Sequence, residues 1–277
     1  LGDVYKRQVP RSALIDAGKY FLARQERSAG ISDEEIIKIA VKSMGLDDLK
    51  PFVASEKVIE SLIEPAHGDR LIDMTCKGFA EETASESPAP GGGSISAYMG
   101  ALGAALGTMV ANLSAHKPGW DDRWEEFGRQ AEEGQKHLKA LLGLVDEDTA
   151  AFNRIMDAFK LPKGTEAEKA ARSAAIQDAT LYATEVPLRT MEAASAVFPL
   201  LKSMAETGNP ASVSDAGVGA LAARSAVLGA GLNVRINAAG LKDRAKADEI
   251  LARAAELARE AKEKEAEILE IVDRIIG

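Results

Sequence analysis

Hydrophobic and polar residues alternate along most of this chain with the periodicity of helices. Apolar side chains recur every three or four residues, which places them on one face of a helix. Runs with the two-residue alternation of a half-buried strand are almost absent. The pattern predicts long helices over residues 94–114, 121–159, 165–207, 212–237 and 242–275. We therefore expect an all-α fold, in which these helices form an antiparallel bundle.

The first part of the chain has a different texture from the rest. Its predicted helices are short, and one of them begins at Ser32, the N-cap of a capping box. This part ends in the linker-like sequence IEPAHGDR, so we place a domain boundary within residues 65–68. Residues 1–67 are expected to form a short helical unit, and residues 68–277 to form the bundle.

The predicted helix over residues 165–207 contains two local signals. Thr165 and Glu168 form a second capping box, which marks the start of the helix. Pro187 lies inside the helix, and because proline removes one backbone hydrogen bond, we expect a kink there. A further helix is expected over residues 68–85.

The predicted helix 94–114 is unusual, because no charged residue lies between Glu86 and Lys117. It is long enough to cross a bilayer. Its glycines and alanines make it weakly hydrophobic, however, and the other helices are amphipathic. We therefore expect a central helix that is buried on all sides, whose small residues let neighbouring helices or a second copy of the chain pack closely. No membrane partner is expected.

Composition and charge exclude several classes of function. Aromatic residues make up only 5% of the 277 residues, so the core is expected to be aliphatic. The net charge of −9 argues against nucleic acid as a partner. The single cysteine, Cys76, excludes a disulfide framework and favours a cytoplasmic location, and residues 1–8 contain no apolar stretch typical of a signal peptide. The three histidines are scattered, so no metal site is expected.

A run of three glycines precedes the small-residue helix. Gly91, Gly92 and Gly93 are followed by Ser94, and glycines allow backbone N–H groups to face outward at a helix N-terminus. Such a loop binds anionic or hydrogen-bond-accepting groups, or it serves as a flexible joint, and the sequence leaves both interpretations open. Its spacing matches neither a Walker A loop nor a dinucleotide-binding fingerprint.

One carboxylate lies on an apolar helix face. Asp148 follows Val145 by three residues and precedes Phe152 by four, so it shares the face that points to the core. Burial of a carboxylate raises its pKa toward the range of a general acid or base. The alternative is a partly buried carboxylate that pairs with a lysine or arginine of another helix.

A second polar stripe lies in the predicted helix 212–237. Gly229, Asn233 and Asn237 recur every four residues, and asparagine is a poor helix former. These amides are therefore expected to bond to a ligand or to another helix. Asp215 lies near the start of the same helix, where a capping role is the alternative to a functional one.

Six segments of the chain are distinctive in sequence and in order: APGGGSISA, GALGTMVANL, DEDTAAFNRIMDAFKLPK, VPLRTMEAA, GNPASVSDAGVGA and GAGLNVRIN. Through these segments, residues 68–277 resemble the cyclodeaminase/cyclohydrolase family that acts on tetrahydrofolate. The earlier segments VPRSALIDAGKYFLARQ and MGLDDLKPF resemble the end of the transferase domain in the fused formiminotransferase-cyclodeaminase family. Most of that domain is missing, so no transferase activity is expected. Residues 1–8 do not fit this pattern and are interpreted as an artefact.

The resemblance implies a formimidoyltetrahydrofolate cyclodeaminase, an ammonia-lyase that converts 5-formimidoyltetrahydrofolate to 5,10-methenyltetrahydrofolate and ammonia. It places Asp148 at the position of the family's catalytic aspartate, as proton donor and acceptor. Because N10 attacks the formimino carbon within one molecule, positioning of the substrate supplies much of the rate. The resemblance implies no metal and no cofactor besides the folate substrate.

The resemblance also implies binding residues and partners. The expected folate contacts are Gly91, Gly92, Gly93, Ser94, Lys163, Asp215, Asn233 and Asn237. Lys163 either meets the anionic glutamate tail as a point charge or is a solvated loop lysine. The family implies a folate substrate, polyglutamylated or not, and a homodimer or higher homo-oligomer with folate sites near the dimer interface.

Three further functions stay open. A methenyltetrahydrofolate cyclohydrolase hydrolyses the same methenyl product to 10-formyltetrahydrofolate, and no residue separates the two reactions. The resemblance to a transferase remnant favours the cyclodeaminase, because a fused transferase makes the formimino substrate. The remaining two functions are those of a non-catalytic helical oligomerisation protein and of a folate-binding module without turnover.

Overall fold

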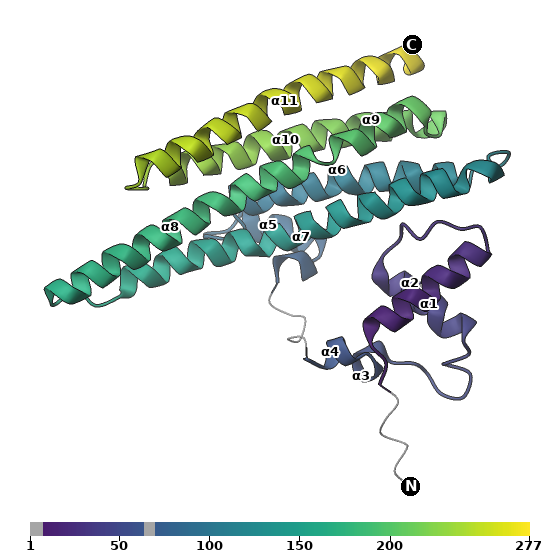
Figure 1. The fold of residues 1–277 in the computed structure, drawn as a ribbon, viewed down its shortest axis with the longest axis horizontal. Coiled ribbons are helices and arrows are strands. Elements are labelled where there is room, and N and C mark those ends of the chain that lie inside the picture. Colours follow the sequence, from purple (N-terminus) through teal and green to yellow (C-terminus); the bar gives the residue numbers. More distant parts are fainter. Residues whose placement is uncertain (1–7, 64–69) are drawn as a thin grey trace, which may run out of the picture.

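The computed structural model describes residues 8–63 and 70–277, which form two helical parts (Figure 1). The regular elements in these residues are α-helices and short 3-10 helices, and the extended contact is an isolated parallel bridge between Val9 and Val58. The predicted all-α fold is confirmed. The predicted boundary within residues 65–68 lies outside the described residues, as do residues 1–7 of the segment interpreted as an artefact.

Long helices form the larger part and lie side by side along one direction (Figure 1). They are α6 (Gly92–Ala115), α7 (Trp124–Lys160), α8 (Glu166–Ser195), α9 (Phe198–Thr207), α10 (Val213–Ala238) and α11 (Arg244–Ile276). Their bounds agree closely with the predicted ranges, except where one predicted helix is divided into α8 and α9. The short 3-10 helices η2 (Asp121–Arg123) and η3 (Pro210–Ser212) precede α7 and α10.

The small residues of α6 let its neighbours approach closely, as predicted. A Cβ added at Gly103 would lie 2.9 Å from Gly219 O on α10, and a Cβ added at Gly100 would lie 3.0 Å from Leu141 Cδ2 on α7. Both neighbours run antiparallel to α6. Side chains larger than hydrogen at these points would separate the helices, which would cost the dispersion contacts of a closely packed core.

The prediction that α6 is buried on all sides is wrong for one face. Leu102, Met109 and Leu113 are 46%, 38% and 46% exposed, because the neighbouring helices leave this side uncovered. By length and composition, α6 and the segment Pro210–Ala238 could each cross a membrane. Within the bundle, 61% and 44% of their most apolar stretches are buried.

The helix predicted over residues 165–207 is divided into α8 and α9, and the kink expected at Pro187 stays a prediction. α8 continues through Pro187, and the break comes later, where α9 begins with Pro199 in its first turn. Proline is tolerated there because the first N–H groups of a helix have no intrahelical acceptor. The predicted capping box is confirmed, since Glu168 N donates to Thr165 Oγ1 at 3.2 Å and Thr165 N donates to Glu168 Oε2 at 2.8 Å.

The smaller part packs around a core of its own. It contains α1 (Arg11–Arg24), α2 (Asp33–Ser43), α3 (Ala54–Lys57) and α4 (Ile59–Ile63), which surround the buried side chains Leu14, Ala40 and Val58. It contacts the bundle at Gly30, whose O accepts a 2.7 Å hydrogen bond from Asn112 Nδ2 on α6. A Cβ at Gly30 would overlap Ala131 of α7, so this joint requires glycine.

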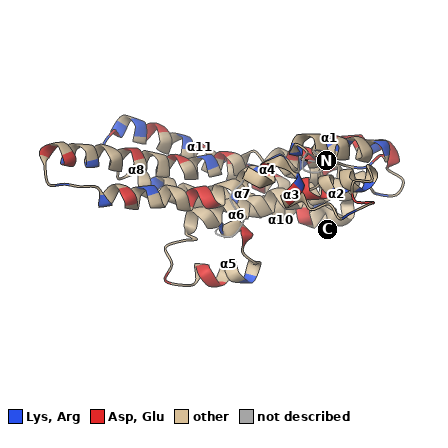
Figure 2. Cartoon of the chain, turned by 90° about the horizontal axis from the view of Figure 1, so that it is seen from below, with Lys and Arg blue, Asp and Glu red and all other residues tan. Residues whose placement is uncertain are grey.

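The helix predicted over residues 68–85 is divided in the structure. η1 (Leu71–Asp73) and α5 (Cys76–Thr83) take its place, and Thr75 Oγ1 accepts a 3.0 Å hydrogen bond from Gly78 N as the N-cap of α5. α5 projects from the bundle (Figure 2), and its Phe79 packs against Tyr98 of α6, with the ring centres 5.2 Å apart.

Candidate active site

Asp148 points from α7 at the first turn of α6. Its Oδ2 accepts hydrogen bonds from Ser94 N at 2.9 Å and from Ser94 Oγ at 3.1 Å. Ser94 N belongs to the first turn of α6, where the N–H groups have no intrahelical acceptor and form the positive end of the helix dipole. The carboxylate therefore caps α6 from a neighbouring helix, and this contact holds the carboxylate in one orientation.

Burial raises the pKa of the Asp148 carboxyl, and the two hydrogen bonds from Ser94 lower it by less. Within the described residues, no lysine or arginine pairs with this carboxylate. The alternative interpretation, an ion pair with another helix, is therefore wrong. A carboxyl with a raised pKa that is held by neutral donors is better suited than an ordinary aspartate to accept and return a proton.

One of the three glycines, Gly93, is required by the packing of α7 against the start of α6. A Cβ at Gly93 would overlap the Asp148 carboxylate, so the carboxylate can reach α6 only past a glycine. A Cβ at Gly92 would lie 3.4 Å from Asn233 Nδ2, which is a tight but tolerable contact. Gly91 has extended backbone and only Pro88 O near its Cβ position, at 3.7 Å. The loop therefore brings α6, α7 and α10 together at Asp148.

Asn233 of α10 lies near Gly92, and Asp148 of α7 lies near Gly93, so both side chains reach the start of α6. Its Nδ2 donates to Gly229 O one turn earlier at 3.1 Å, and no described donor reaches its Oδ1. This amide oxygen is thus free to accept a hydrogen bond near the start of α6. The structure places the predicted residues Gly91, Gly92, Gly93, Ser94, Asp148 and Asn233 at one point where three helices meet.

Asn237 has a structural partner instead of facing a free site. Its Nδ2 donates to Ala183 O on α8 at 2.7 Å. In a regular helix that carbonyl would accept from the N–H four residues later, but residue 187 is a proline and has none. Asn237 therefore replaces the hydrogen bond that Pro187 removes, which is the helix-to-helix bond allowed for by the sequence.

Asp215 is not brought to Asp148 within one chain. It lies in the first turn of α10, about 27 Å along that helix from Asn233. Because α10 is antiparallel to α6, Asp215 lies at the end of the bundle where α6 finishes, opposite the glycine loop. The expectation that Asp215 joins the other residues in one site is therefore not met in the single chain, since a continuous helix separates them.

Lys163 also lies apart from Asp148, in the exposed loop between α7 and α8. α7 extends about 18 Å beyond Asp148 before this loop. Lys163 lines a hollow of about 420 Å³ together with Lys169, Arg172, Ser173, Ile176, Gln177 and Lys242. This cationic hollow is a suitable place for an anionic group, at a distance from the carboxylate.

Sequence reasoning missed a polar cluster next to Asp148. Glu147 Oε1 accepts hydrogen bonds of 2.6 Å from both Tyr182 Oη and Arg189 Nη2 on α8. Burial raises the pKa of Glu147, but the bonds from Arg189 and Tyr182 outweigh it, so the pKa is lowered and the side chain stays ionised. Because the partners lie far apart in the sequence, no local spacing could have found them. The cluster joins α7 to α8 beside the site.

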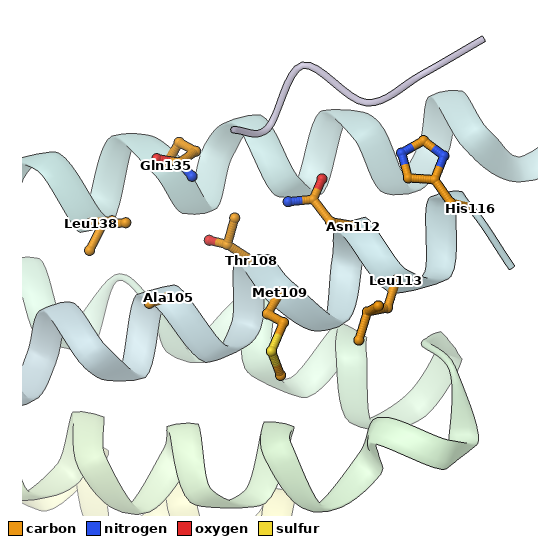
Figure 3. Close-up of a pocket in the computed structure, with 8 residues that line it drawn as sticks. All are labelled: Ala105, Thr108, Met109, Asn112, Leu113, His116, Gln135 and Leu138. Carbon is orange, nitrogen blue, oxygen red and sulfur yellow. The ribbon is translucent and has the colours of Figure 1, made fainter. Parts of the chain in front are cut away.

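A second hollow, of about 430 Å³, lies between α6 and α7 (Figure 3). It is lined by Ala105, Thr108, Met109, Asn112, Leu113, His116, Gln135 and Leu138. Its lining residue Thr108 is about 21 Å along α6 from Ser94. Burial and the nearby Arg27 charge lower the pKa of His116. None of the predicted site residues lines this hollow.

Comparison with known proteins places this site in a family. The family model described as formiminotransferase-cyclodeaminase matches residues 75–256, a range that contains every predicted site residue. The chain belongs to the formiminotransferase-cyclodeaminase family. A second family model, described as the formiminotransferase domain, matches residues 7–64.

Curated proteins that are similar to this chain include both longer and shorter ones. Formimidoyltransferase-cyclodeaminase of Mus musculus is 35% identical over 262 residues, which are 94% of this chain and 48% of the mouse protein. A methenyltetrahydrofolate cyclohydrolase of Methylorubrum extorquens is 42% identical over 177 residues, which are 64% of this chain and 85% of that protein. The chain thus spans about half the length of the longer relatives.

A solved structure is also similar. The crystal structure of formiminotetrahydrofolate cyclodeaminase from Thermotoga maritima superimposes with a TM-score of 0.65 at 26% identity. The match covers 74% of this chain and 98% of that one. The identification of the family from the sequence is therefore confirmed.

Proposed function

We propose that this protein is a formimidoyltetrahydrofolate cyclodeaminase, which forms 5,10-methenyltetrahydrofolate and releases ammonia. The observation that carries the proposal is the Asp148 carboxyl, which is partly buried, has a raised pKa and is oriented by Ser94 at the first turn of α6. Family membership supports the reaction class. The free Oδ1 of Asn233 near the start of α6 offers an acceptor for an N–H group of the substrate.

The proposed mechanism needs one proton to move between two nitrogens. The formimino group reacts in its protonated, cationic form. N10 attacks its carbon, a C–N bond forms, and the former C=N bond becomes a single bond to an NH2 group. The N10 proton passes to the Asp148 carboxylate, which returns it to this NH2 group. The bond from the carbon to this nitrogen then breaks, ammonia leaves, and the positive charge stays on the methenyl product. Positioning of N10 against the carbon can contribute roughly 7–11 kcal/mol to lowering the barrier. The carboxylate also stabilises the cationic carbon centre.

The proposal contains no metal and no cofactor besides the folate substrate. The one-carbon unit keeps its oxidation state throughout, so the reaction needs neither a hydride carrier nor another redox group. Lys163 is proposed to meet the anionic glutamate tail, which its place in the cationic hollow supports. A cytoplasmic location stays a prediction.

A methenyltetrahydrofolate cyclohydrolase is the second candidate. The Methylorubrum extorquens relative, 42% identical over 177 residues, favours it. In that reaction Asp148 would accept a proton from the water that attacks the methenyl carbon. The same carboxyl can serve either reaction. In the cyclodeaminase reaction ammonia leaves the one-carbon unit, whereas in the cyclohydrolase reaction water attacks it.

We also propose a homodimer formed by the uncovered side of α6 and α10. This α6–α10 face carries the exposed apolar side chains Leu102, Met109, Leu113, Val218, Leu221, Leu232 and Ile236. Figure 2 shows these two helices almost free of charged residues. If two copies meet there in antiparallel orientation, the Asp215 end of one chain lies beside the Asp148 end of the other. Such a dimer would unite residues that one chain keeps apart.

The test is turnover of 5-formimidoyltetrahydrofolate by the purified chain, followed by methenyl absorbance and by released ammonia. We expect both products in equal amounts, and we expect an Asp148→Asn variant of equal helicity to form neither. A parallel assay with 5,10-methenyltetrahydrofolate tests the cyclohydrolase. Loss of methenyl absorbance in that assay alone would replace the first proposal by the second. If the protein binds folate but catalyses neither reaction, its function is that of a folate-binding module. If it does not bind folate, its function is that of a non-catalytic oligomerisation protein.

Two Gly→Ala variants, one that crowds Asp148 and one that does not, give this test a matched control. Gly93→Ala is expected to abolish turnover, because the new Cβ would occupy the space of the Asp148 carboxylate. Gly143→Ala, on the exposed side of α7, is expected to leave turnover nearly unchanged, because no atom lies within 4 Å of its Cβ position. Equal activity of the two variants would remove Asp148 from the proposed mechanism.

A further inference from the structure

α7 presents an apolar strip to solvent directly beyond Asp148. Phe152, Met156 and Phe159 are 41%, 43% and 50% exposed. They follow Asp148 at intervals of three or four residues, so they continue the same face of the helix. We call these three residues the α7 strip.

The α7 strip is uncovered because α6 begins at the level of Asp148. Before that point the same face of α7 packs against α6, and Leu141 and Val145 are fully buried. Beyond it, α7 and α8 run on past the start of α6 as a two-helix arm (Figure 1). Apolar side chains that leave a core and remain exposed in line with a candidate catalytic group are typical of a binding surface.

The far end of the α7 strip is cationic. The Arg172 guanidinium lies 5.5 Å from the centre of the Phe159 ring and donates to Phe159 O at 3.0 Å. Arg172 also lines the hollow that contains Lys163 and Lys242. Phe159 is about 16 Å along α7 from Asp148. The order along the arm is therefore carboxylate, then apolar and aromatic groups, then cations.

We propose that the α7 strip seats the aminobenzoyl-glutamate arm of the folate substrate, with the reacting atoms at Asp148 and the glutamate carboxylates at Lys163 and Arg172. This inference rests on the proposed function. A folate carries its groups in the matching order, because the aminobenzoyl ring follows N10 and the anionic glutamate follows the ring. Ring contacts with Phe152 and Met156 and charge contacts with the lysine fit this order.

The first experiment substitutes the apolar part of the seat. The double variant Phe152→Ala/Met156→Ala is expected to raise KM for 5-formimidoyltetrahydrofolate about tenfold through lost apolar contact, with kcat little changed. Both side chains are nearly half exposed, so the fold should persist. The control Ile275→Ala removes an apolar side chain of similar exposure, 46%, at the end of α11 and should leave KM unchanged.

The second experiment separates the ring from the carboxylates. Lys163→Gln should raise KM for the tetrahydrofolate substrate but not for its tetrahydropteroate counterpart, which lacks the glutamate. The α7 strip variant should raise KM for both. Lys262→Gln on α11 is the matched control. Equal effects of Lys163→Gln on the two substrates would overturn its place at the carboxylates.

A binding measurement with an unreactive folate tests the α7 strip independently of catalysis. Calorimetric titration with 5-formyltetrahydrofolate, an unreactive analogue, should show weaker binding to the α7 strip variant than to the wild type. Unchanged binding and KM in an active protein would overturn the seat and leave the cyclodeaminase assignment intact. A change in oligomer size instead of KM would show that a second copy covers the α7 strip. A wild type that neither turns over nor binds the analogue would overturn both.

Discussion

At the scale of the residue, the decisive feature is the Asp148 carboxyl, whose pKa is shifted in opposite directions by burial and by hydrogen bonding. Burial raises the pKa of Asp148, whereas the hydrogen bonds from Ser94 lower it by less. Folding therefore favours the protonated form of this carboxyl. As pH rises from the unfolded-state pKa through the folded-state pKa, ionised Asp148 costs stability. Such a cost is expected where a group is kept for chemistry and not for the fold.

Asp148→Asn is accordingly expected to lose turnover without losing stability. The asparagine Oδ1 can still accept from Ser94 N, while the cost of burying a charge disappears. Near neutral pH the free energy of unfolding in urea should equal or exceed that of the wild type, and the difference should vanish below the ordinary aspartate pKa. Asp157→Asn, an exposed site paired with Lys160 at 2.9 Å, is the control. A marked loss of stability at neutral pH would contradict this account.

Ser94→Ala should move the pH dependence of the reaction. Removal of the hydroxyl takes away one of the bonds that lower the pKa of Asp148, so this pKa rises further. If the carboxylate accepts the N10 proton, the acid limb of the kcat profile shifts to higher pH. Ser96→Ala is the control, because Ser96 Oγ donates to Gly92 O at 2.7 Å and does not touch Asp148. An unshifted limb in Ser94→Ala would assign that limb to another group.

At the scale of the element, α8 and α10 are joined by a hydrogen bond from the Asn237 side chain to the backbone of α8. Pro187 leaves Ala183 O without its helical donor, and Asn237 supplies one across the interface. The helix therefore continues through a proline that would otherwise leave a carbonyl unsatisfied. Asn237, which the family resemblance implied as a folate contact, thus stabilises the packing of α10 against α8.

A double-mutant cycle tests this joint. Asn237→Ala should destabilise the wild type by about 1–3 kcal/mol, the cost of an unsatisfied buried acceptor. In a Pro187→Ala background the same change should cost much less, because residue 187 again donates to Ala183 O. Thermal or urea unfolding of the four proteins gives the coupling. Additive effects would show that the two residues act independently.

At the scale of the whole molecule, charge and apolar surface are divided between faces. α11 carries ion pairs such as Arg259 with Glu263 at 2.7 Å, whereas the α6–α10 face is almost uncharged (Figure 2). That face is apolar over the whole length of two helices. A second copy would remove this surface from water, which is the main driving force of association.

Leu113→Glu is expected to convert the dimer to a monomer, because it places a charge in the proposed contact. Light scattering should show the halved mass, and circular dichroism should show unchanged helicity. Turnover should fall although Leu113 lies at the opposite end of α6 from Asp148, since the partner's Asp215 end is lost from the site. Ile276→Glu is the control, at an exposed apolar position outside this face. A monomeric wild type with full activity would contradict the dimer.

Local features of the fold were predictable from the sequence. The helix periodicity located the long helices within a few residues, because hydrogen bonds in a helix join near neighbours. The capping box at Thr165 and the direction of Asp148 toward the core follow from the same short-range geometry. The break between α8 and α9 was not predicted, and neither was the hydrogen bond by which Asn237 compensates for Pro187, because that bond joins residues far apart in the sequence.

The sequence by itself determined that this protein is all-helical, that one carboxylate faces its core and that the chain belongs to the formiminotransferase-cyclodeaminase family. Only the tertiary structure decided that Ser94 holds this carboxylate, that Glu147 binds α8, and that Asp215 lies at the far end of the bundle. It also decided that α6 has an open face and that the α7 strip is uncovered. These features depend on which helices meet and where each one starts, and such contacts join residues whose separation in sequence carries no local signal.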